Sequence, residues 1–354
     1  MMNKIKVLIV DDSAIVRNVL SEKLSEKPNI EIVGTAPDPF VARNMIIQLK
    51  PDVITLDIEM PRMDGLTFLS KLMNYYPIPV IIVSSITTQD KSASIKALEM
   101  GAFDIVNKPG SSISVQDVTD EIAYKIEMAY KIKDTYIARR DLIQKHLNNL
   151  TKSAPITNTY LSSFKTTDFL LAIGSSTGGT IALEYIFERL PANMPPILIV
   201  QHMPPGFTNQ FAGRLNELSK MKVKESEHGE IIATGTAYIA MGGFHMAVER
   251  RGGNLFIKHT LDDRVHFQRP SVDVLFNSLA ENAGKNCAAS LLTGMGKDGA
   301  NGLLKLKQSG AYTIAQDEET SIVWGMPKAA IDLNAQTEIV SLDKMPQKLI
   351  ELIK

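Results

Sequence analysis

The stretch FLLAIGSSTGGTIALEYIFERL, residues 169–190, reads as a strand, a tight turn and a helix in direct succession. The apolar run 169–173 predicts a buried strand, and the apolar spacing after Gly179 predicts a helix. The turn GSSTGG lacks the Lys-Ser/Thr ending of a phosphate-binding loop, and Ser176 stands where a GxGxxG motif needs its second glycine. A serine on such a turn is typical of a nucleophile whose oxyanion is stabilised by nearby amides, although a serine before a helix is more often an N-cap. The turn therefore offers two candidate nucleophiles, Ser175 and Ser176.

The alternation of strand and helix extends over both halves of the chain, from Lys6 to Lys108 and again from Phe169. It predicts an α/β fold in which helices cover both faces of parallel sheets. The first half contains five strand-like runs and is predicted to be doubly wound. The second half is predicted to form a mostly parallel sheet with an antiparallel insertion at residues 236–259, where glycine turns join strand-like runs.

A stretch rich in Ser and Thr without periodicity, residues 151–168, separates the two halves and predicts a linker. We therefore expect a first domain over residues 1–125, a helix extension and linker over residues 126–168, and a second domain over residues 169–354.

Composition narrows the classes of function. The net charge of −1 and the lack of a basic stripe give no support to nucleic-acid binding. The single cysteine, Cys287, cannot form an internal disulfide, which favours a reducing compartment and a cytoplasmic location. No apolar run approaches the ~20 residues of a membrane span, so we expect no direct membrane insertion.

Polar residues stand at strand ends in the first half: Asp11 and Asp12 after the first strand, then Asp57, Ser84 and Lys108 after the third, fourth and fifth. The carboxyl ends of parallel strands meet at one edge, so these residues should converge. Three carboxylates at one place repel one another unless a hard cation such as Mg²⁺ joins them. Asp57 is then placed to attack phosphorus, with Ser84 and Lys108 on the phosphoryl oxygens. Acids at helix N-termini would explain any one of these residues, but they explain the whole set poorly.

This pattern resembles the two-component receiver domain, a flavodoxin-like (βα)5 unit, over roughly residues 4–125. The resemblance implies that Asp57 is the phospho-acceptor and that Ser84 and Lys108 are the switch and ion-pairing residues. It implies a Mg²⁺ site formed by Asp11, Asp12, Asp57 and the backbone carbonyl of Glu59. Ile105 stands where many receivers carry an aromatic switch residue.

A nucleophilic serine needs a base and an acid that orients the base. His202 follows the strand-like run PILIVQ, and Asp298 follows a further strand within LLTGMGKDGA. Ser176, His202 and Asp298 would form a triad at three strand ends, although the histidine alone could bond a carbonyl and the aspartate alone could cap a helix. The other histidines show no metal-ligand spacing and are interpreted as surface or packing residues: His146, His228, His245, His259 and His266.

The segment GMGKDG, residues 294–299, offers a different interpretation because it matches GxGxxG after a strand, with Asp317 near the place of a ribose-binding acid. An NAD-dependent oxidoreductase is therefore an alternative. Against it, Asp298 would bring negative charge to a pyrophosphate, and Ser176 and His202 would be left without a role.

From residue 169 to about 350 the chain resembles the catalytic domain of the chemotaxis protein-glutamate methylesterase (CheB) family, on the motifs LAIGSSTGG, VQHMPPGFT, MGGFHM, RPSVDVLF and LLTGMGKDGA. The resemblance implies Ser176 as nucleophile, His202 as base, Asp298 as its orienter and the backbone amide of Met295 as oxyanion donor, with no cofactor in this domain. Ser175 stands where the family more often has Ala. The implied activity is phosphorylation-activated hydrolysis of glutamate γ-methyl esters on methyl-accepting chemoreceptors, with deamidation of receptor glutamines and a chemotaxis histidine kinase as phosphodonor. A non-catalytic, phosphorylation-dependent scaffold is a second alternative.

Overall fold

The computed structural model describes residues 4–61, 63–85, 88–108, 114–150 and 169–353. Contacts divide the chain into two compact units, Met1–Arg140 and Asp141–Lys354. The linker predicted at residues 151–168 lies outside the described residues, and the predicted domain boundaries stay predictions.

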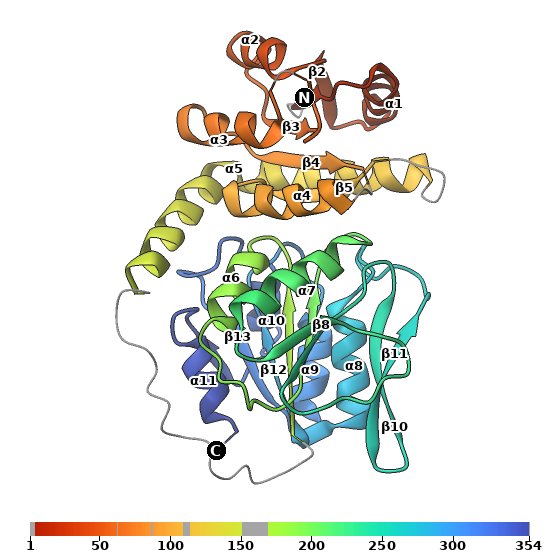
Figure 1. The fold of residues 1–354 in the computed structure, drawn as a ribbon, viewed down its shortest axis with the longest axis vertical. Helices are drawn as coiled ribbons and strands as arrows, with labels where there is room; N and C mark the ends of the chain where they lie inside the picture. The colour runs from red at the N-terminus through yellow and green to blue at the C-terminus, as the bar shows by residue number, and fades with distance from the viewer. Residues whose placement is uncertain (1–3, 62, 86–87, 109–113, 151–168, 354) are drawn as a thin grey trace. The chain divides into compact units, whose positions relative to one another are not determined.

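The first unit contains a five-stranded sheet in the order β2-β1-β3-β4-β5, in which every neighbouring pair is parallel (Figure 1). Its strands are β1 (Ile5–Val10), β2 (Ile30–Ala36), β3 (Val53–Leu56), β4 (Val80–Ser84) and β5 (Asp104–Asn107). β3 and β4 are buried along their whole length, which explains why they read as continuous apolar runs. The predicted doubly wound fold is confirmed.

The helices of this unit are α1 (Ala14–Ser25), α2 (Pro39–Leu49), α3 (Gly65–Tyr75), α4 (Thr88–Met100) and α5 (Val115–Leu150), which extends beyond the limit of the unit at Arg140. The sequence predicts a helix extension beyond residue 125, and α5 is continuous over 36 residues that include no Gly or Pro. Tyr136 on α5 is buried, donates to the carbonyl of Ala102 at 3.1 Å and packs edge-on against Phe103. The helix therefore packs on the first unit well past residue 125.

The second unit contains a seven-stranded sheet in the order β14-β13-β12-β6-β7-β9-β8, again with every neighbouring pair parallel. Its strands are β6 (Leu170–Ser175), β7 (Ile197–Gln201), β8 (Lys222–Glu225), β9 (Thr236–Ile239), β12 (Cys287–Leu291), β13 (Tyr312–Gln316) and β14 (Glu338–Val340). Its helices are α6 (Gly179–Phe187), α7 (Phe207–Leu218), α8 (Val272–Asn282), the 3₁₀ turn η1 (Gly284–Asn286), α9 (Ala300–Gln308), α10 (Met326–Asp332) and α11 (Met345–Glu351).

The predicted antiparallel insertion is a separate hairpin, β10 (His245–Arg251) and β11 (Asn254–Thr260), turned by Gly252 and Gly253 at positive φ. The first strand-like run of that segment, TAYI, is not part of the insertion. It forms β9 in the parallel sheet, where all four of its residues are buried. A strand buried on both faces suits a parallel sheet, whereas β10 becomes exposed toward its end.

The register of the large sheet brings three loops together. Ser175 at the end of β6 pairs with Gln201 at the end of β7, and Gly174 pairs with Leu291 at the end of β12. The loops that follow these three neighbouring strands therefore leave the sheet at the same edge, where the carboxyl ends of parallel strands form binding sites.

Candidate active site

The turn after β6 is as tight as its glycines suggest. Gly178 has φ +80°, a conformation that favours glycine, and it lies at the N-cap of α6. The amide of Ser176 donates to the carbonyl of Thr293 at 3.0 Å, and a side chain at Gly294 would come within 2.8 Å of the Ser176 Cβ. The turn that carries Ser176 is thus packed directly against the loop after β12.

The two serines have different environments. The hydroxyl of Ser175 is fully buried and donates to Gln201 Oε1 at 2.7 Å. Gln201 Nε2 donates in turn to the carbonyls of Ser176 and His202, at 2.9 and 3.1 Å. Ser176 Oγ makes no hydrogen bond to any residue that the structure describes. Ser175 is therefore a structural residue, and Ser176 has the free hydroxyl.

His202 lies after β7 with its ring Nε2 at 2.7 Å from Asp298 Oδ2. The ring is buried, and its Nδ1 has no hydrogen-bond partner among the described residues. Because Asp298 is an acceptor, the neutral ring carries its proton on Nε2 and leaves the Nδ1 lone pair open. The structure thus brings His202 and Asp298 together as predicted. It records no hydrogen bond between His202 and Ser176, whose contact in related sites often tightens only with substrate bound.

Asp298, only 1% exposed, is held by four donors. Besides His202, the amide of Val272 donates to Oδ2 at 2.7 Å, and Oδ1 accepts from the Ser271 hydroxyl at 2.8 Å and the Asp273 amide at 3.0 Å. Burial alone would raise the pKa of this carboxyl, but the His202 contact and the two amides outweigh it and hold the pKa below its usual range. Asp298 is an anion at neutral pH.

Met295 lies in the same loop as Asp298, and its amide donates to none of the described residues. The neighbouring Gly294 is fixed on both sides: its amide donates to Val323, its carbonyl accepts from Met326, and it pairs with Trp324 in an isolated bridge. An unused amide on a fixed loop beside the Ser176 turn is suited to stabilise an oxyanion.

The dinucleotide interpretation of residues 294–299 loses its support in this geometry. The Asp298 carboxylate is hydrogen-bonded to His202 and to the first turn of α8. Asp317 accepts from the amide and hydroxyl of Thr320 within its own loop, so it is not directed at a ribose.

The strand ends of the first unit converge as predicted. Lys108 Nζ lies 2.9 Å from Asp11 Oδ2 and 2.8 Å from Asp57 Oδ2, and the Lys108 amide donates to the carbonyl of buried Ser84. Burial raises the pKa of Asp57 to about 6, with Lys108 offsetting part of the rise. The pKa of Lys108 is raised, because its pairing with the two carboxylates outweighs its burial.

This acidic pocket has the donor set of a magnesium site. Carboxylate oxygens of Asp11, Asp12 and Asp57 lie within 4.8 Å of one another, and Lys108 neutralises only part of their charge. Hard oxygen ligands with an excess of negative charge fit Mg²⁺. Arg17 donates to the carbonyls of Asp11 and Asp12 and orders their loop. The sequence alone does not predict this role.

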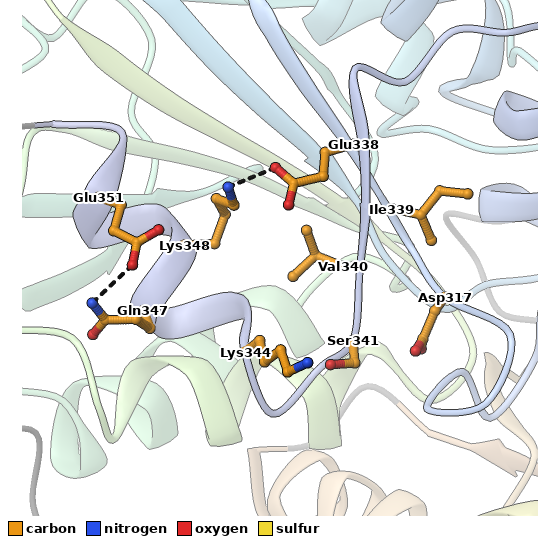
Figure 2. Close-up of a pocket in the computed structure, with 9 residues that line it drawn as sticks. All are labelled: Asp317, Glu338, Ile339, Val340, Ser341, Lys344, Gln347, Lys348 and Glu351. Atoms are coloured by element: carbon orange, nitrogen blue, oxygen red, sulfur yellow. Dashed lines mark hydrogen bonds and ion pairs between the residues drawn. The ribbon is translucent and has the colours of Figure 1, made fainter.

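A separate hollow of about 440 Å³ follows β13 and β14, lined by Asp317, Glu338, Ile339, Val340, Ser341, Lys344, Gln347, Lys348 and Glu351. Figure 2 shows Lys348 paired with Glu338 and Gln347 paired with Glu351. The Lys348 Nζ–Glu338 Oε2 distance is 2.6 Å, and the Gln347 Nε2–Glu351 Oε1 distance is 3.1 Å. These four polar groups are directed at one another, and the lining includes no residue of the predicted triad or of the predicted phosphorylation site.

Comparison with known proteins adds to this geometry. Residues 171–349 match the CheB methylesterase family, and residues 7–119 match the response regulator receiver domain. The chain is 48% identical to the protein-glutamate methylesterase/protein-glutamine glutaminase 2 of Syntrophus aciditrophicus, over 99% of this chain and 100% of that protein. It is also 48% identical to the corresponding protein of Sulfurimonas denitrificans, over 99% of this chain and 98% of that one. The solved catalytic domain of Thermotoga maritima CheB methylesterase aligns with a TM-score of 0.52 at 43% identity, covering 53% of this chain and 100% of that domain. Among the described residues, no helix is both long and apolar enough to cross a membrane.

Proposed function

Since this chain belongs to the CheB methylesterase family and carries a receiver domain, we propose that it is a phosphorylation-activated protein-glutamate methylesterase and protein-glutamine glutaminase. The observation that carries the proposal is the placement of Ser176, His202 and ionised Asp298 after three neighbouring strands of one sheet.

In the proposed reaction, Ser176 Oγ attacks the ester carbonyl of a glutamate γ-methyl ester while its proton passes to His202 Nδ1. Asp298 stabilises the imidazolium that forms, and the Met295 amide donates to the oxyanion. Collapse of the tetrahedral intermediate transfers the proton from His202 to the departing methoxide, which leaves as methanol. Water, deprotonated by His202, then hydrolyses the acyl-enzyme to glutamate and frees Ser176. A glutamine side chain follows the same course, with ammonia as leaving group.

The first unit supplies the proposed control. Asp57 would accept the phosphoryl group, with Lys108 and Ser84 on its oxygens. Asp11, Asp12, Asp57 and the backbone carbonyl of Glu59 would hold Mg²⁺, which when bound offsets negative charge around the transferring group. The unphosphorylated receiver would restrain the esterase and phosphorylation would release it.

The proposed partners are a chemotaxis histidine kinase as phosphodonor and methyl-accepting chemoreceptors as substrates. We propose that the protein acts in the cytoplasm, without nucleic acid and without inserting into the membrane itself. The domain limits proposed for this division of labour are residues 1–125 for the receiver, 126–168 for the helix extension and linker, and 169–354 for the esterase.

Methanol release from methylated receptor signalling domains, measured on the full chain with and without acetyl phosphate and Mg²⁺, tests the proposal. We expect methanol in both cases and about tenfold more with the phosphodonor. Absence of methanol under both conditions would contradict the esterase. An NAD-dependent absorbance change in the same samples would instead support the oxidoreductase, and full signalling function after loss of Ser176 would support the scaffold.

A further inference from the structure

Two motifs of the second unit, MGGFHM and RPSVDVLF, contain no member of the triad. The structure places one residue of each near Asp298: Ser271 contacts Asp298, and His245 contacts Ser271. Both side chains are fully buried, as is expected of groups that hold a neighbour in place rather than contact a ligand.

Ser271 occupies the N-cap position of α8, but its hydroxyl does not bond the helix amides. It donates to Asp298 Oδ1 at 2.8 Å, and Asp298 itself accepts from the first two amides of α8, those of Val272 and Asp273. The usual structural role of a serine at this position is thus taken over by a carboxylate from a distant loop. The Ser271 hydroxyl is therefore free to donate its hydrogen bond to Asp298.

His245, the first residue of β10, holds Ser271 from the other side. Its Nδ1 accepts from the Ser271 amide at 3.2 Å, and its Nε2 lies 3.0 Å from the carbonyl of Asp263. A carbonyl only accepts, so the ring satisfies both contacts only as the neutral tautomer with its proton on Nε2. The ring therefore bridges the Asp263 carbonyl and the Ser271 amide, and it holds the backbone of the residue whose hydroxyl donates to Asp298.

We propose that Ser271 and His245 are positioning residues for the esterase reaction, which fix the orientation of the Asp298 carboxylate toward His202. The inference rests on the proposed function, since it assumes that Asp298 orients the catalytic base. Hydrogen bonds to Asp298 act on turnover through the imidazolium, which exists only once Ser176 has begun to attack. Loss of the Ser271 hydroxyl should therefore lower kcat and leave KM nearly unchanged.

The test compares Ser271→Ala, Ser271→Thr and Ser290→Ala in the full chain by methanol release. Ser290 on β12 is the matched control, because it is equally buried and its hydroxyl has no hydrogen-bond partner among the described residues. We expect Ser271→Ala to lose about 10- to 100-fold in kcat, as for one hydrogen bond to a charged group. Ser271→Thr, which keeps the hydroxyl, should regain most of this loss, and Ser290→Ala should stay near the parent rate.

A second readout does not depend on turnover. The proton shared by His202 Nε2 and Asp298 should give a downfield ¹H resonance that shifts or broadens in Ser271→Ala and stays in place in Ser290→Ala. A Ser271→Ala protein with the parent resonance and the parent kcat would overturn the inference. If Ser271→Ala loses its native circular dichroism, the inference is tested instead by comparing kcat in His245→Gln and His245→Phe. Only Gln can both accept from the Ser271 amide and donate to Asp263, so His245→Gln should have the higher kcat. Equal kcat in these two would also overturn it.

The proposed function fails differently. If Asp298→Asn turns over like the parent, the triad itself is wrong. If Asp298→Asn is nearly inactive and Ser271→Ala is fully active, only the positioning role is wrong.

Discussion

Two buried aspartates that follow strands of the parallel sheets, Asp57 directly after β3 and Asp298 in the loop between β12 and α9, are held in opposite ways. Asp57 pairs with Lys108, which it shares with Asp11, and burial raises its pKa to about 6. Asp298 is as deeply buried, yet four donors surround its oxygens and its pKa is lowered. The number of donors, rather than burial, therefore decides which carboxylate is the stable anion.

The difference matches what each group is proposed to do. A carboxylate that accepts a phosphoryl group needs an oxygen with its lone pairs free for attack, and donors on that oxygen would compete with phosphorus. A carboxylate that only stabilises an imidazolium loses nothing when every lone pair is occupied. The two sites can be separated experimentally, because a change at one should leave the other reaction intact.

The largest expected effect is on the nucleophile. Ser176→Ala should reduce methanol release by about 10⁶-fold, as for loss of a triad nucleophile, and should still accept phosphate at Asp57 from acetyl phosphate. Ser175→Ala is the control: it loses a bond to Gln201 but no reacting group, so much of the activity should remain. An inactive Ser175→Ala beside an active Ser176→Ala would reverse the assignment.

Asp298→Asn should follow, with a loss of about 10⁴-fold in kcat, by analogy with the aspartate of a serine protease. An amide cannot stabilise the imidazolium and can hold His202 in the wrong tautomer. The matched change in the first unit, Asp57→Asn, should keep the unphosphorylated rate. Steady-state methanol assays of both variants at equal concentration check the contrast, and a similar loss in both would refute the separation of roles.

Regulation should require the phospho-acceptor Asp57. We expect Asp57→Ala to stay at the low basal rate and ignore acetyl phosphate, whereas the parent rises about tenfold, a preference of about 1.4 kcal/mol. Residues ~165–354 alone should exceed the unphosphorylated full chain. A truncated protein no faster than the full chain would leave the receiver without a restraining role.

The two aspartates should also affect stability with opposite pH dependence. The pKa of Asp57 is higher in the folded protein than in the unfolded chain. Its favourable contribution to the free energy of unfolding is therefore complete below the pKa of the unfolded chain and is lost as the pH rises through about 6. In EDTA at pH 8, Asp57→Asn should therefore slow amide hydrogen exchange in β1 and β3. The free energy of opening should rise by an amount on the order of 1 kcal/mol, a figure that allows for the lost pairing with Lys108. At pH 5 the difference should shrink. Equal protection at both pH values would contradict the raised pKa.

Asp298 should have the opposite pH dependence in its contribution to the stability of the second unit, and the effect should be seen only at acidic pH. Its lowered folded pKa means that its contribution is complete above the unfolded pKa and is lost as the pH falls through the folded value. Melting by circular dichroism should show a steeper loss of stability below about pH 4 in the parent than in Asp298→Asn. Parallel curves for the two proteins would show that Asp298 is not the anion described.

Much of the fold followed from the sequence because its strands are buried and apolar. The edge strands β8 and β14 escaped prediction, since KVKE and EIV are short and only partly buried. The length of α5 was also underestimated, because Arg139 and Arg140 interrupt its apolar spacing between Tyr136 and Ile143, although the segment contains no Gly or Pro that would break a helix.

The sequence identified the candidate site better than it identified the residues that support it. Ser176, His202 and Asp298 follow strand-like runs, so their convergence could be predicted from topology alone. Gln201, Ser271 and His245 act through partners 25 to 27 positions away. No periodicity encodes such contacts, and the sequence alone indicates only a surface or packing role for His245.

Trp324 is the only tryptophan of the chain, and its backbone pairs with Gly294, next to the amide proposed to face the oxyanion. The protein thus carries its own optical reporter at the loop where substrate is expected to bind. Excited at the red edge of its absorption, this indole gives a signal free of tyrosine emission. Occupancy of the site could then be followed by emission intensity in unlabelled enzyme, including variants such as Ser176→Ala that no longer turn over.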